Sequence, residues 1–340
     1  MTALCMEYVK KPVVYKDLNQ QEAAEVMEAA MEGKLTSAQI ASFLTALTMK
    51  GETAEEITGM ARVMRAKSRK VRAPADAVDT CGTGGDGLGT FNVSTTAALI
   101  TAGAGVSVVK HGNRSVTSRC GSADLLEALG VNVEMEPREA LRCLEYSGFT
   151  FLFAPLYHQA MRHASAPRRE IGFRTAFNLL GPLTNPAGVG RQVIGVPHPS
   201  LVELLAEVCS MLEAEHVLVV HGGDGSDELS LEGENLVMEV HRGKIRQLPV
   251  DLRSLGFSLP GEADSGDLRG GSPEVNAAIT RKVLAGHRCP AREMALLNAA
   301  AALLVSGKVE SLEHGVELAR EAVEEGGAER VLEKLYSAGR

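Results

Sequence analysis

The chain has 340 residues, of which 45% are hydrophobic and 23% are charged, and its formal net charge at pH 7 is −8. This length exceeds what one core usually supports, so it predicts a globular protein with a large and a small domain. The acidic balance without runs of like charge argues against a nucleic-acid-binding surface, and no apolar run approaches the roughly 20 residues of a membrane span. We therefore expect a small-molecule ligand, with no nucleic acid and no membrane as partner.

The six cysteines show neither a CxxC pair nor the spacing of a metal site, and the N-terminal segment has no hydrophobic signal core. This usage is typical of reduced thiols, so we expect a cytoplasmic protein.

Helical periodicity dominates the first 70 residues. Asn19 is positioned to cap a helix with an apolar face, and a second helix is expected to stop at Gly51. Thr53 and Glu56 have the spacing of a capping box before a third helix. The pattern predicts a small helical unit whose apolar stripes serve as core and dimer contact rather than as a cofactor site.

Beyond residue 76, short apolar runs alternate with helical stretches such as 201–212. The predicted buried strands are 77–78, 106–109, 149–153, 193–196 and 217–220. An antiparallel excursion is expected over 236–249 with a turn at 242–244, and helices from Pro273 onward. This pattern indicates an α/β fold with a mostly parallel central sheet flanked by helices. The polar loops that follow its strands should meet at one edge of that sheet.

The stretch CGTGGDGLGTFNVST, residues 81–95, contains five glycines in nine residues. A strand, a glycine run and a helix from about Ser94 together direct backbone N–H groups and a helix N-terminus at an anion such as phosphate. The motif is neither a Walker loop nor a GxGxxG fingerprint. The hydroxyls of Ser94 and Thr95 can donate to phosphate oxygens, and that of Ser94 also suits a phosphate-bound Mg²⁺. The alternative is a simple glycine turn with an N-cap at Asn92 or Ser94.

A second polar loop, KHGNRSVTSRCGSAD at 110–124, follows the next predicted strand. Its charged and neutral donors are Lys110, His111, Asn113, Arg114, Ser115, Thr117, Ser118 and Ser122. Such donors suit a second polyanion contact, and two successive loops of this kind should converge on one ligand with several phosphates. The alternative is a solvated basic turn. His111 by itself is expected to be a structural or orienting histidine rather than a general base.

Two further segments carry charges suited to binding. The segment 162–186 contains four arginines, one of which is a candidate for the carboxylate of a second substrate: Arg162, Arg168, Arg169 and Arg174. Surface pairing with acids such as Glu170 is the alternative. In GGDGSDELS, residues 222–230, Asp227 and Glu228 stand side by side after a strand and can hold Mg²⁺, the alternative being exposed turn acids.

These segments, in this order, resemble the anthranilate phosphoribosyltransferases of tryptophan biosynthesis over nearly the whole chain. The shared motifs are GTGGD at 82–86, FNVST at 91–95, KHGNR at 110–114, GSAD at 121–124, RREIG at 168–172, FNLLGPLTNP at 177–186 and DE at 227–228. KGET at 50–53 and LLNAAAALL at 296–304 extend the resemblance toward both ends. Gln159 and Ser226 depart from the family pattern, but neither replaces an expected ligand.

The resemblance implies a helical domain over residues 1–72, joined by helices from about 163–185, and an α/β catalytic domain over residues 73–340. It implies transfer of phosphoribosyl from 5-phosphoribosyl 1-diphosphate to the amine of anthranilate, with release of diphosphate. Members of this family use Mg²⁺, here two ions per subunit, and are usually homodimers through the helical domain.

The resemblance also implies a set of site residues. The phosphoribosyl donor would be surrounded by Gly82, Gly85, Asp86, Thr90, Asn92, Val93, Ser94, Thr95, Lys110, His111, Gly112, Asn113, Arg114, Ser115, Val116, Thr117, Ser118 and Ser122. Anthranilate would contact Gly82, Asn113 and Arg168. Ser94 and Glu228 would reach one Mg²⁺, and Asp227 and Glu228 the other. No covalent nucleophile and no general base is assigned.

Two rival functions use the same architecture. A nucleoside phosphorylase would share the anion loops but would not need a metal-binding acid pair, so Asp227 and Glu228 count against it. A non-enzymatic nucleic-acid-binding relative would need a basic face, which the net charge of −8 does not favour.

Overall fold

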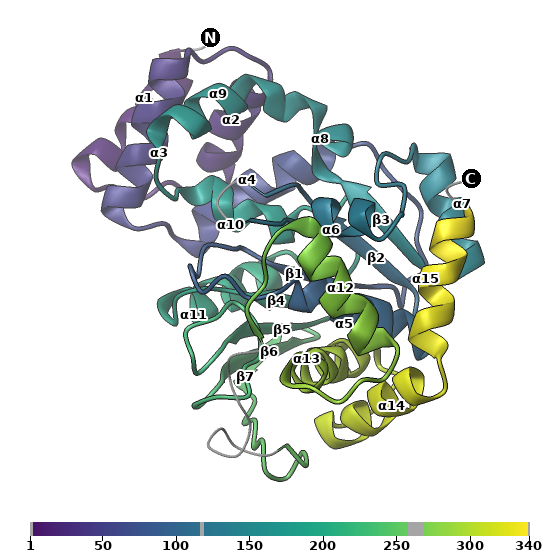
Figure 1. The fold of residues 1–340 in the computed structure, drawn as a ribbon. Coiled ribbons are helices and arrows are strands. Elements are labelled where there is room, and N and C mark those ends of the chain that lie inside the picture. The colour runs from purple at the N-terminus through teal and green to yellow at the C-terminus, as the bar shows by residue number, and fades with distance from the viewer. Residues whose placement is uncertain (1–2, 116–118, 258–267, 339–340) are drawn as a thin grey trace.

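The structure, a computed structural model, describes residues 3–115, 119–257 and 268–338 and consists of a helical part and a larger α/β part (Figure 1). Three of the expected donor-binding residues, Val116, Thr117 and Ser118, lie outside the described residues. No helix in the described ranges has both the length and the apolar character needed to cross a membrane.

The N-terminal helical unit contains α1 (Ala3–Lys10), η1 (Pro12–Val14), α2 (Gln20–Met31), α3 (Ser37–Lys50) and α4 (Ala54–Lys67). Its helix ends follow the sequence signals. Asn19 caps α2, α3 ends before Gly51, and Thr53 and Glu56 form the predicted capping box of α4. Each cap supplies partners for backbone groups that the helix leaves unpaired, which is why these boundaries are predictable.

The chain returns to this unit after the third strand. Helix α8 (Ala154–Tyr157) still packs on that strand, and the returning elements are η2 (Gln159–Met161), α9 (Arg162–Ile171) and α10 (Ala176–Leu183). Helix α9 packs against α2 and α3, and α10 packs against α3 and α4. Phe177 of α10 is buried in the same hydrophobic cluster as Met27 and Met60. A separate stretch of chain therefore completes the packing of the first four helices.

A seven-stranded sheet forms the centre of the larger part, in the order β3-β2-β1-β4-β5-β6-β7. Its strands are β1 (Val78–Gly82), β2 (Val108–Gly112), β3 (Phe149–Phe153), β4 (Arg191–Gly195), β5 (His216–His221), β6 (Leu236–His241) and β7 (Lys244–Gln247). Strands β1 to β5 are parallel, whereas β6 and β7 form an antiparallel extension. The mostly parallel α/β fold is thus confirmed.

Two details of the sheet bear on the sequence analysis. The predicted turn between β6 and β7 is present, with positive φ at Arg242 and Gly243, as a tight two-residue hairpin requires. The predicted bounds of the second strand were wrong, because β2 pairs with β3 from Val108 through Gly112. Lys110 and His111 are therefore strand residues with buried side chains and not part of a solvated loop.

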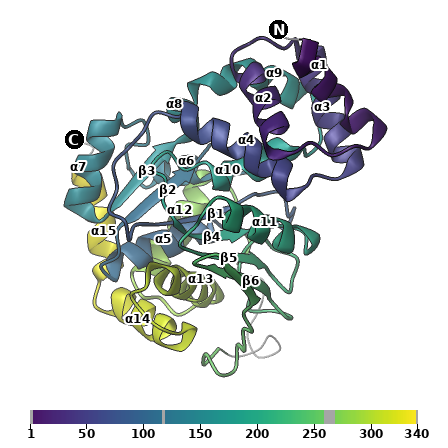
Figure 2. The same ribbon diagram turned by 180° about the vertical axis from the view of Figure 1, so that it is seen from behind.

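Helices cover both faces of the sheet, as Figures 1 and 2 show from opposite sides. One face carries α5 (Val93–Gly103) and α13 (Pro290–Ser306), and α11 (Ser200–Met211) packs on β5 and β6. The other helices are α6 (Ser122–Ala128), α7 (Pro137–Ser147), α12 (Pro273–Leu284), α14 (Leu312–Glu324) and α15 (Gly327–Ala338).

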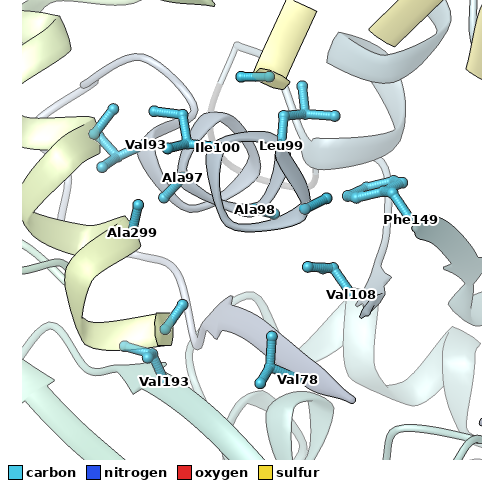
Figure 3. Close-up of a cluster of buried hydrophobic side chains, with 14 of the residues drawn as sticks. Val78, Val93, Ala97, Ala98, Leu99, Ile100, Val108, Phe149, Val193 and Ala299 are labelled. Atoms are coloured by element: carbon cyan, nitrogen blue, oxygen red, sulfur yellow. The ribbon is translucent and has the colours of Figure 1, made fainter. Parts of the chain in front are cut away.

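Small residues let α5 lie deep in the core. Ala97 and Ala98 of α5 and Ala299 of α13 are fully buried near Val78 and Val108 of the strands (Figure 3). A helix that buries small side chains on several faces can approach both a sheet and a neighbouring helix closely. This packing fixes the position of the N-terminus of α5, which faces the candidate site.

Candidate active site

The site begins where glycines make room for an acidic side chain. A Cβ atom added to Gly82 would lie 2.2 Å from Oδ2 of Asp227, and one added to Gly195 would lie 1.6 Å from the Asp227 carbonyl oxygen. Gly82 and Gly195 are the paired last residues of β1 and β4. The carboxyl ends of two central strands therefore hold a carboxylate that any larger residue would displace.

The glycine loop, residues 83–92, connects β1 to α5 and lies directly against this carboxylate. The Gly84 amide donates a hydrogen bond to Oδ2 of Asp227 over 2.7 Å. Gly84 and Gly85 have φ values of 66° and 87°, a region that disfavours other residues. The loop thus needs glycine for its backbone conformation as well as for close approach.

Arg174 covers the glycine loop from the segment between α9 and α10. Its guanidinium donates to the carbonyl oxygen of Gly84 and, over 3.2 Å, to the hydroxyl of Thr83. A Cβ atom added to Gly85 would lie 1.9 Å from Nη1 of Arg174. Burial lowers the pKa of Arg174, while Asp227 and Asp86 act in the opposite direction. Arg174 therefore supplies positive charge next to two acids of the site.

The far end of the glycine loop is tied to the segment 268–270. The Phe91 amide donates to the Leu268 carbonyl over 3.0 Å, and the Gly270 amide donates to the Gly89 carbonyl over 2.9 Å. Thr90 and Arg269 form an isolated antiparallel bridge between these two bonds. The loop is consequently held at both ends while its central glycines remain exposed.

Asn92 precedes α5, but its side chain does not cap that helix. Nδ2 of the Asn92 side chain instead donates to the Cys120 carbonyl over 3.1 Å, and Oδ1 of the same side chain accepts from Nδ2 of Asn276 over 2.8 Å. In the first turn of α5 the Ser94 amide donates to Oε1 of Glu228 over 3.1 Å. The N-terminus of α5 is thus directed at a carboxylate, a position that also favours other anions.

The acidic pair, Asp227 and Glu228, has pKa values raised above the ordinary ones. Burial raises the pKa of Asp227, and the nearby Asp86 carboxylate raises it further. Burial likewise raises the pKa of Glu228, followed by the charge of Asp227. Within the described part of the chain, neither carboxylate has an ion pair within 4.0 Å. Two partly buried carboxylates that repel each other favour a cation between them.

The neighbours of the acidic pair fit a divalent cation. Ser94 places a hydroxyl beside Glu228, and Nζ of Lys110 lies 3.4 Å from that hydroxyl. Carboxylate and hydroxyl oxygens are ligands that Mg²⁺ accepts, together with waters and substrate phosphates. The chemistry of this donor set is therefore compatible with Mg²⁺.

Lys110 reaches from β2 to Thr80 of β1 and Ser94 of α5, with only 2% of its surface exposed. Its ammonium group contacts the backbone carbonyl of Thr80. Burial raises the pKa of both Asp79 and Glu228, and the charge of Lys110 acts in the opposite direction on each. Asp79 accepts hydrogen bonds from the His111 amide over 3.2 Å and from Nδ2 of Asn185 over 2.9 Å. Lys110 thus reduces the charge imbalance of the acids from inside the sheet.

His111 and His158 are buried neighbours whose imidazole rings are tilted toward each other with centroids 5.1 Å apart. Burial lowers the pKa of His111 to about 3 and that of His158 to about 4. Both rings are therefore neutral at physiological pH. Nδ1 of His111 lies 3.2 Å from the Gly181 carbonyl, whereas its Nε2 has no hydrogen-bond partner among the described residues.

The residues that follow β2 are more exposed to solvent than Lys110 and His111 within it. Asn113 is exposed, and its carbonyl accepts a bond from the Ser122 hydroxyl over 3.3 Å at the start of α6. Arg114 pairs with Glu127 and Asp124, and these acids raise the pKa of its guanidinium. Arg114 therefore already has carboxylate partners, which makes it less available to a phosphate than the sequence analysis assumed.

Arg168 and Arg169 are adjacent on α9 but have different environments. Arg168 is partly buried, and burial together with the positive charge of Arg174 lowers its pKa. In the described structure it has no ion pair, and the suggested pairing of these arginines with Glu170 is not formed. Arg169 is exposed. A partly buried guanidinium without a partner carboxylate is suited to receive one from a ligand.

Comparison with known proteins gives the family. The glycosyl transferase family matches with its helical bundle domain over residues 6–68 and its a/b domain over residues 74–329. The chain is 51% identical over 328 residues to the anthranilate phosphoribosyltransferase of Pelotomaculum thermopropionicum, covering 96% of this chain and 94% of that protein. The chain belongs to the anthranilate phosphoribosyltransferase family.

Solved anthranilate phosphoribosyltransferases have the same fold. The crystal structure of the enzyme from Thermus thermophilus is 45% identical and superposes with a TM-score of 0.91, covering 98% of this chain and 99% of that one. The enzyme from Saccharomyces cerevisiae in complex with PRPP and Mg is 28% identical with a TM-score of 0.89, covering 99% and 98% of the two chains. The yeast enzyme is also known in complex with 4-fluoroanthranilate.

Within this family framework, the structure brings together several residues that sequence reasoning had not connected. Arg174 had been one of four candidate arginines, whereas Asn276 and the segment 268–270 had no expected role. Asp79 carried a weak signal, since it is a charged residue inside the otherwise uncharged strand VDTCG. Asn276 carried none, because its contact with Asn92 joins residues 184 positions apart.

Proposed function

We propose that this chain transfers the 5-phosphoribosyl group of 5-phosphoribosyl 1-diphosphate to the amine of anthranilate, giving N-(5-phosphoribosyl)anthranilate and diphosphate in tryptophan biosynthesis. The observation that carries this proposal is the acidic pair, which faces both the glycine loop and the N-terminus of α5. The full-length similarity to enzymes of this name supports the same reaction.

For the donor, we infer binding by backbone groups more than by side chains. The Gly84 amide is bound to Asp227 and the Ser94 amide to Glu228, so the other exposed amides of the glycine loop are the N–H donors offered to phosphate oxygens beside the N-terminus of α5. The buried hydroxyl of Thr95 has no hydrogen-bond partner among the described residues and is a further candidate donor. We retain the donor set proposed from the sequence, with Arg114 as its weakest member because of its carboxylate partners.

Magnesium use is supported by the yeast relative solved with PRPP and Mg and by the oxygen ligands of the acidic pair. We propose two ions, one held by Ser94 and Glu228 and one by Asp227 and Glu228. Bound Mg²⁺ would supply positive charge that stabilises the diphosphate leaving group. The raised pKa values of both acids are expected to fall when a cation binds between them.

For the acceptor, we propose that Arg168 binds the carboxylate of anthranilate, with Asn113 and Gly82 lining the same space. The yeast complex with 4-fluoroanthranilate supports an aromatic carboxylate ligand in this family. Holding the amine in line with C1 of the ribose would supply the proximity contribution to the rate. Positive charge develops on the ribose as diphosphate leaves, so no covalent nucleophile is needed.

A direct assay tests this function. Anthranilate is fluorescent, so its loss in the presence of 5-phosphoribosyl 1-diphosphate and Mg²⁺ should be matched by an equal release of diphosphate. Omission of the donor or of Mg²⁺ should abolish the loss. Unchanged fluorescence combined with phosphorolysis of a nucleoside would favour the nucleoside phosphorylase alternative instead.

We also propose a homodimer formed through the N-terminal helical unit. Val13, Val14 and Tyr15 follow α1 and are 59%, 61% and 66% exposed, and Met49 of the neighbouring α3 is 68% exposed. Exposed apolar side chains that gather in one region are typical of a protein interface. Sedimentation equilibrium should give a dimer for the native chain and a monomer for the double variant Val14→Glu/Met49→Glu, whereas a monomeric native chain would contradict the proposal.

We place the domain division at residues 72–73, with the segment of about 163–185 assigned to the helical domain because α9 and α10 pack on α2 to α4. We further propose a cytoplasmic location. The six cysteines support it, since none of them forms a disulfide within the part of the chain that the structure describes.

A further inference from the structure

A second group of metal-ligand residues lies on the antiparallel strands, outside the candidate active site. Strands β5 and β6 are adjacent in the sheet (Figure 2), with His216 paired to His241 and Leu218 paired to Glu239. Paired residues on neighbouring strands point to the same face, as do residues two apart on one strand. His216, Glu239 and His241, here called the His–Glu–His cluster, therefore project from one face at one end of these strands.

The atoms of the His–Glu–His cluster are close enough to share one ion. One ligand atom from each residue lies within 4.8 Å of the other two. Nε2 of His216 is 2.8 Å from Oε1 of Glu239, and the two imidazole rings stack with centroids 4.3 Å apart and planes inclined by 12°. Two imidazole nitrogens and one carboxylate oxygen form a ligand set that is typical of Zn²⁺ sites with an open fourth position.

The cluster is also held in place by its surroundings. Glu239 is 3% exposed and His216 is 5% exposed, whereas His241 faces solvent. Nε of Arg246 on β7 donates to Oε2 of Glu239, which leaves Oε1 directed toward His216. Such outer hydrogen bonds orient the carboxylate ligands of metal sites. The exposed His241 leaves the open position accessible from solvent.

The positive charges near the cluster have acidic partners. Arg191 on β4 is paired in register with His216, and its guanidinium lies 3.7 Å from Glu215. Arg242 forms an ion pair with the same carboxylate over 3.1 Å. Arg246 is bound to Glu239 itself. Glu215 therefore offsets part of the positive charge that an incoming cation would meet, and the charge of Arg246 is offset by the proposed ligand Glu239 itself.

We propose that the His–Glu–His cluster binds one first-row transition-metal ion of the Zn²⁺ class, which cross-links β5 to β6. Imidazole ligands favour such an ion over Mg²⁺, which prefers oxygen ligands. His216 begins β5 and the acidic pair follows the end of that strand, so the two metal sites are separated by about 17 Å along it. The ion would thus stabilise the antiparallel extension of the sheet and would not contact the substrates.

Zinc titration of the full-length protein tests this proposal. The protein is first treated with a chelator and then titrated with Zn²⁺ against a chromogenic zinc indicator, with excess Mg²⁺ present to compete at the acidic pair. The native chain should bind one equivalent of Zn²⁺, and His241→Ala should weaken that binding by at least about tenfold. His241 is exposed at the end of a strand, so this variant is expected to fold. The substitution His287→Ala, which removes an exposed histidine elsewhere, serves as the matched control.

Two further variants separate the possible explanations. Asp227→Asn/Glu228→Gln should retain the zinc equivalent, because the active-site acids are not its ligands. Glu239→Gln should weaken binding by a similar factor to His241→Ala, and Zn²⁺ should raise the melting temperature of the native chain but not that of either cluster variant. The proposal is overturned if the native chain binds no zinc in excess Mg²⁺, if His241→Ala or Glu239→Gln binds it normally, or if the active-site variant loses it.

Discussion

The amide of Gly84 donates to the carboxylate of Asp227 over 2.7 Å and joins two segments that are 143 residues apart. The contact connects the anion-binding glycine loop directly to the acidic pair. A backbone donor lowers the pKa of Asp227, but burial and the Asp86 charge outweigh it. The loop and the acids therefore form one unit, and changes to either should affect the binding of the same ligand.

We expect Asp227→Asn/Glu228→Gln to reduce turnover steeply while the melting temperature stays constant or rises. The variant removes two charges that burial already disfavours, so the fold loses little, whereas the cation loses its charged ligands. Turnover at several Mg²⁺ concentrations and thermal unfolding are the two measurements. Glu234→Gln, an exposed acid of the same region, is the control. Near-normal turnover at ordinary Mg²⁺ would show that the pair does not act through metal.

Gly84→Val and Gly85→Val should weaken donor binding for partly different reasons. Both residues have positive φ, where a side chain costs about 1–2 kcal/mol. At Gly85 the new side chain would also overlap Arg174, whereas an added Cβ at Gly84 meets no atom of the described residues within 4 Å. We therefore expect the larger increase in the dissociation constant of 5-phosphoribosyl 1-diphosphate for Gly85→Val.

A remote glycine provides the control for this pair. Gly188 has φ of 65°, and among the residues that the structure describes no atom lies within 4 Å of an added Cβ, so Gly188→Val carries the backbone cost without touching the glycine loop. It should lower stability and leave donor binding unchanged. If the donor binds equally well to all three variants, the glycine loop does not hold it.

Arg168→Ala should raise the Michaelis constant for anthranilate by roughly tenfold to a hundredfold, because a charge-assisted hydrogen bond contributes about 1.5–3 kcal/mol. The binding constant of the donor should change little. Arg169→Ala is the matched control on the next position of α9 and should be mild, since that side chain is exposed. Michaelis constants for both substrates are measured in both variants, and a defect restricted to the donor would mean that Arg168 belongs to the other pocket.

The buried histidines predict how stability depends on pH. Burial lowers the pKa of His158 to about 4, below its ordinary value of 6.5, so the unfolded chain binds the extra proton between these values. The contribution of neutral His158 to the free energy of unfolding is fully present above pH 6.5. It is lost as pH falls toward about 4, by about 1.4 kcal/mol per pH unit. Urea unfolding across this range should show a shallower loss for His158→Gln than for the native chain.

The comparison between variants matters because other groups oppose this trend. The raised pKa values of Asp227 and Glu228 mean that the folded state binds protons there more readily, which favours folding as pH falls. Their contribution cancels when His158→Gln is compared with the native chain. His287→Gln, an exposed position, should leave the slope unchanged. Identical slopes in all three proteins would contradict the assigned burial of His158.

The parts of the fold that were predictable are those set by local signals. The capping residues of α2 and α4, the turn at 242–244 and the apolar runs of the strands act over a few residues, and the sequence displays them directly. The end of β2 was not predictable in this way. Lys110 and His111 extend that strand because partners from distant segments satisfy them inside the sheet.

In the candidate site, too, some features were predictable from local sequence and others depend on tertiary contacts. The glycine loop and the acidic pair indicate their chemistry by composition, so their association followed from the rule that parallel strands bind ligands at their carboxyl ends. The orientation of Arg174 over Gly84, the use of Asn92 away from its helix and the engagement of Arg114 by Glu127 depend on tertiary contacts. Residue type alone carries no information about which of several possible partners such a side chain will select.

The second hydrophobic cluster has a practical consequence for anyone who wishes to dissect this protein. It runs without interruption from Met60 of α4, through Leu180 of α10, to Val202 and Leu205 of α11 on the sheet. A fragment that begins after residue 72 would lack α4, so the apolar sides of α10 and α11 that pack against it would be exposed to solvent. The catalytic fragment is therefore expected to be poorly soluble when expressed alone, and to be rescued by co-expression with residues 1–72 as a separate polypeptide.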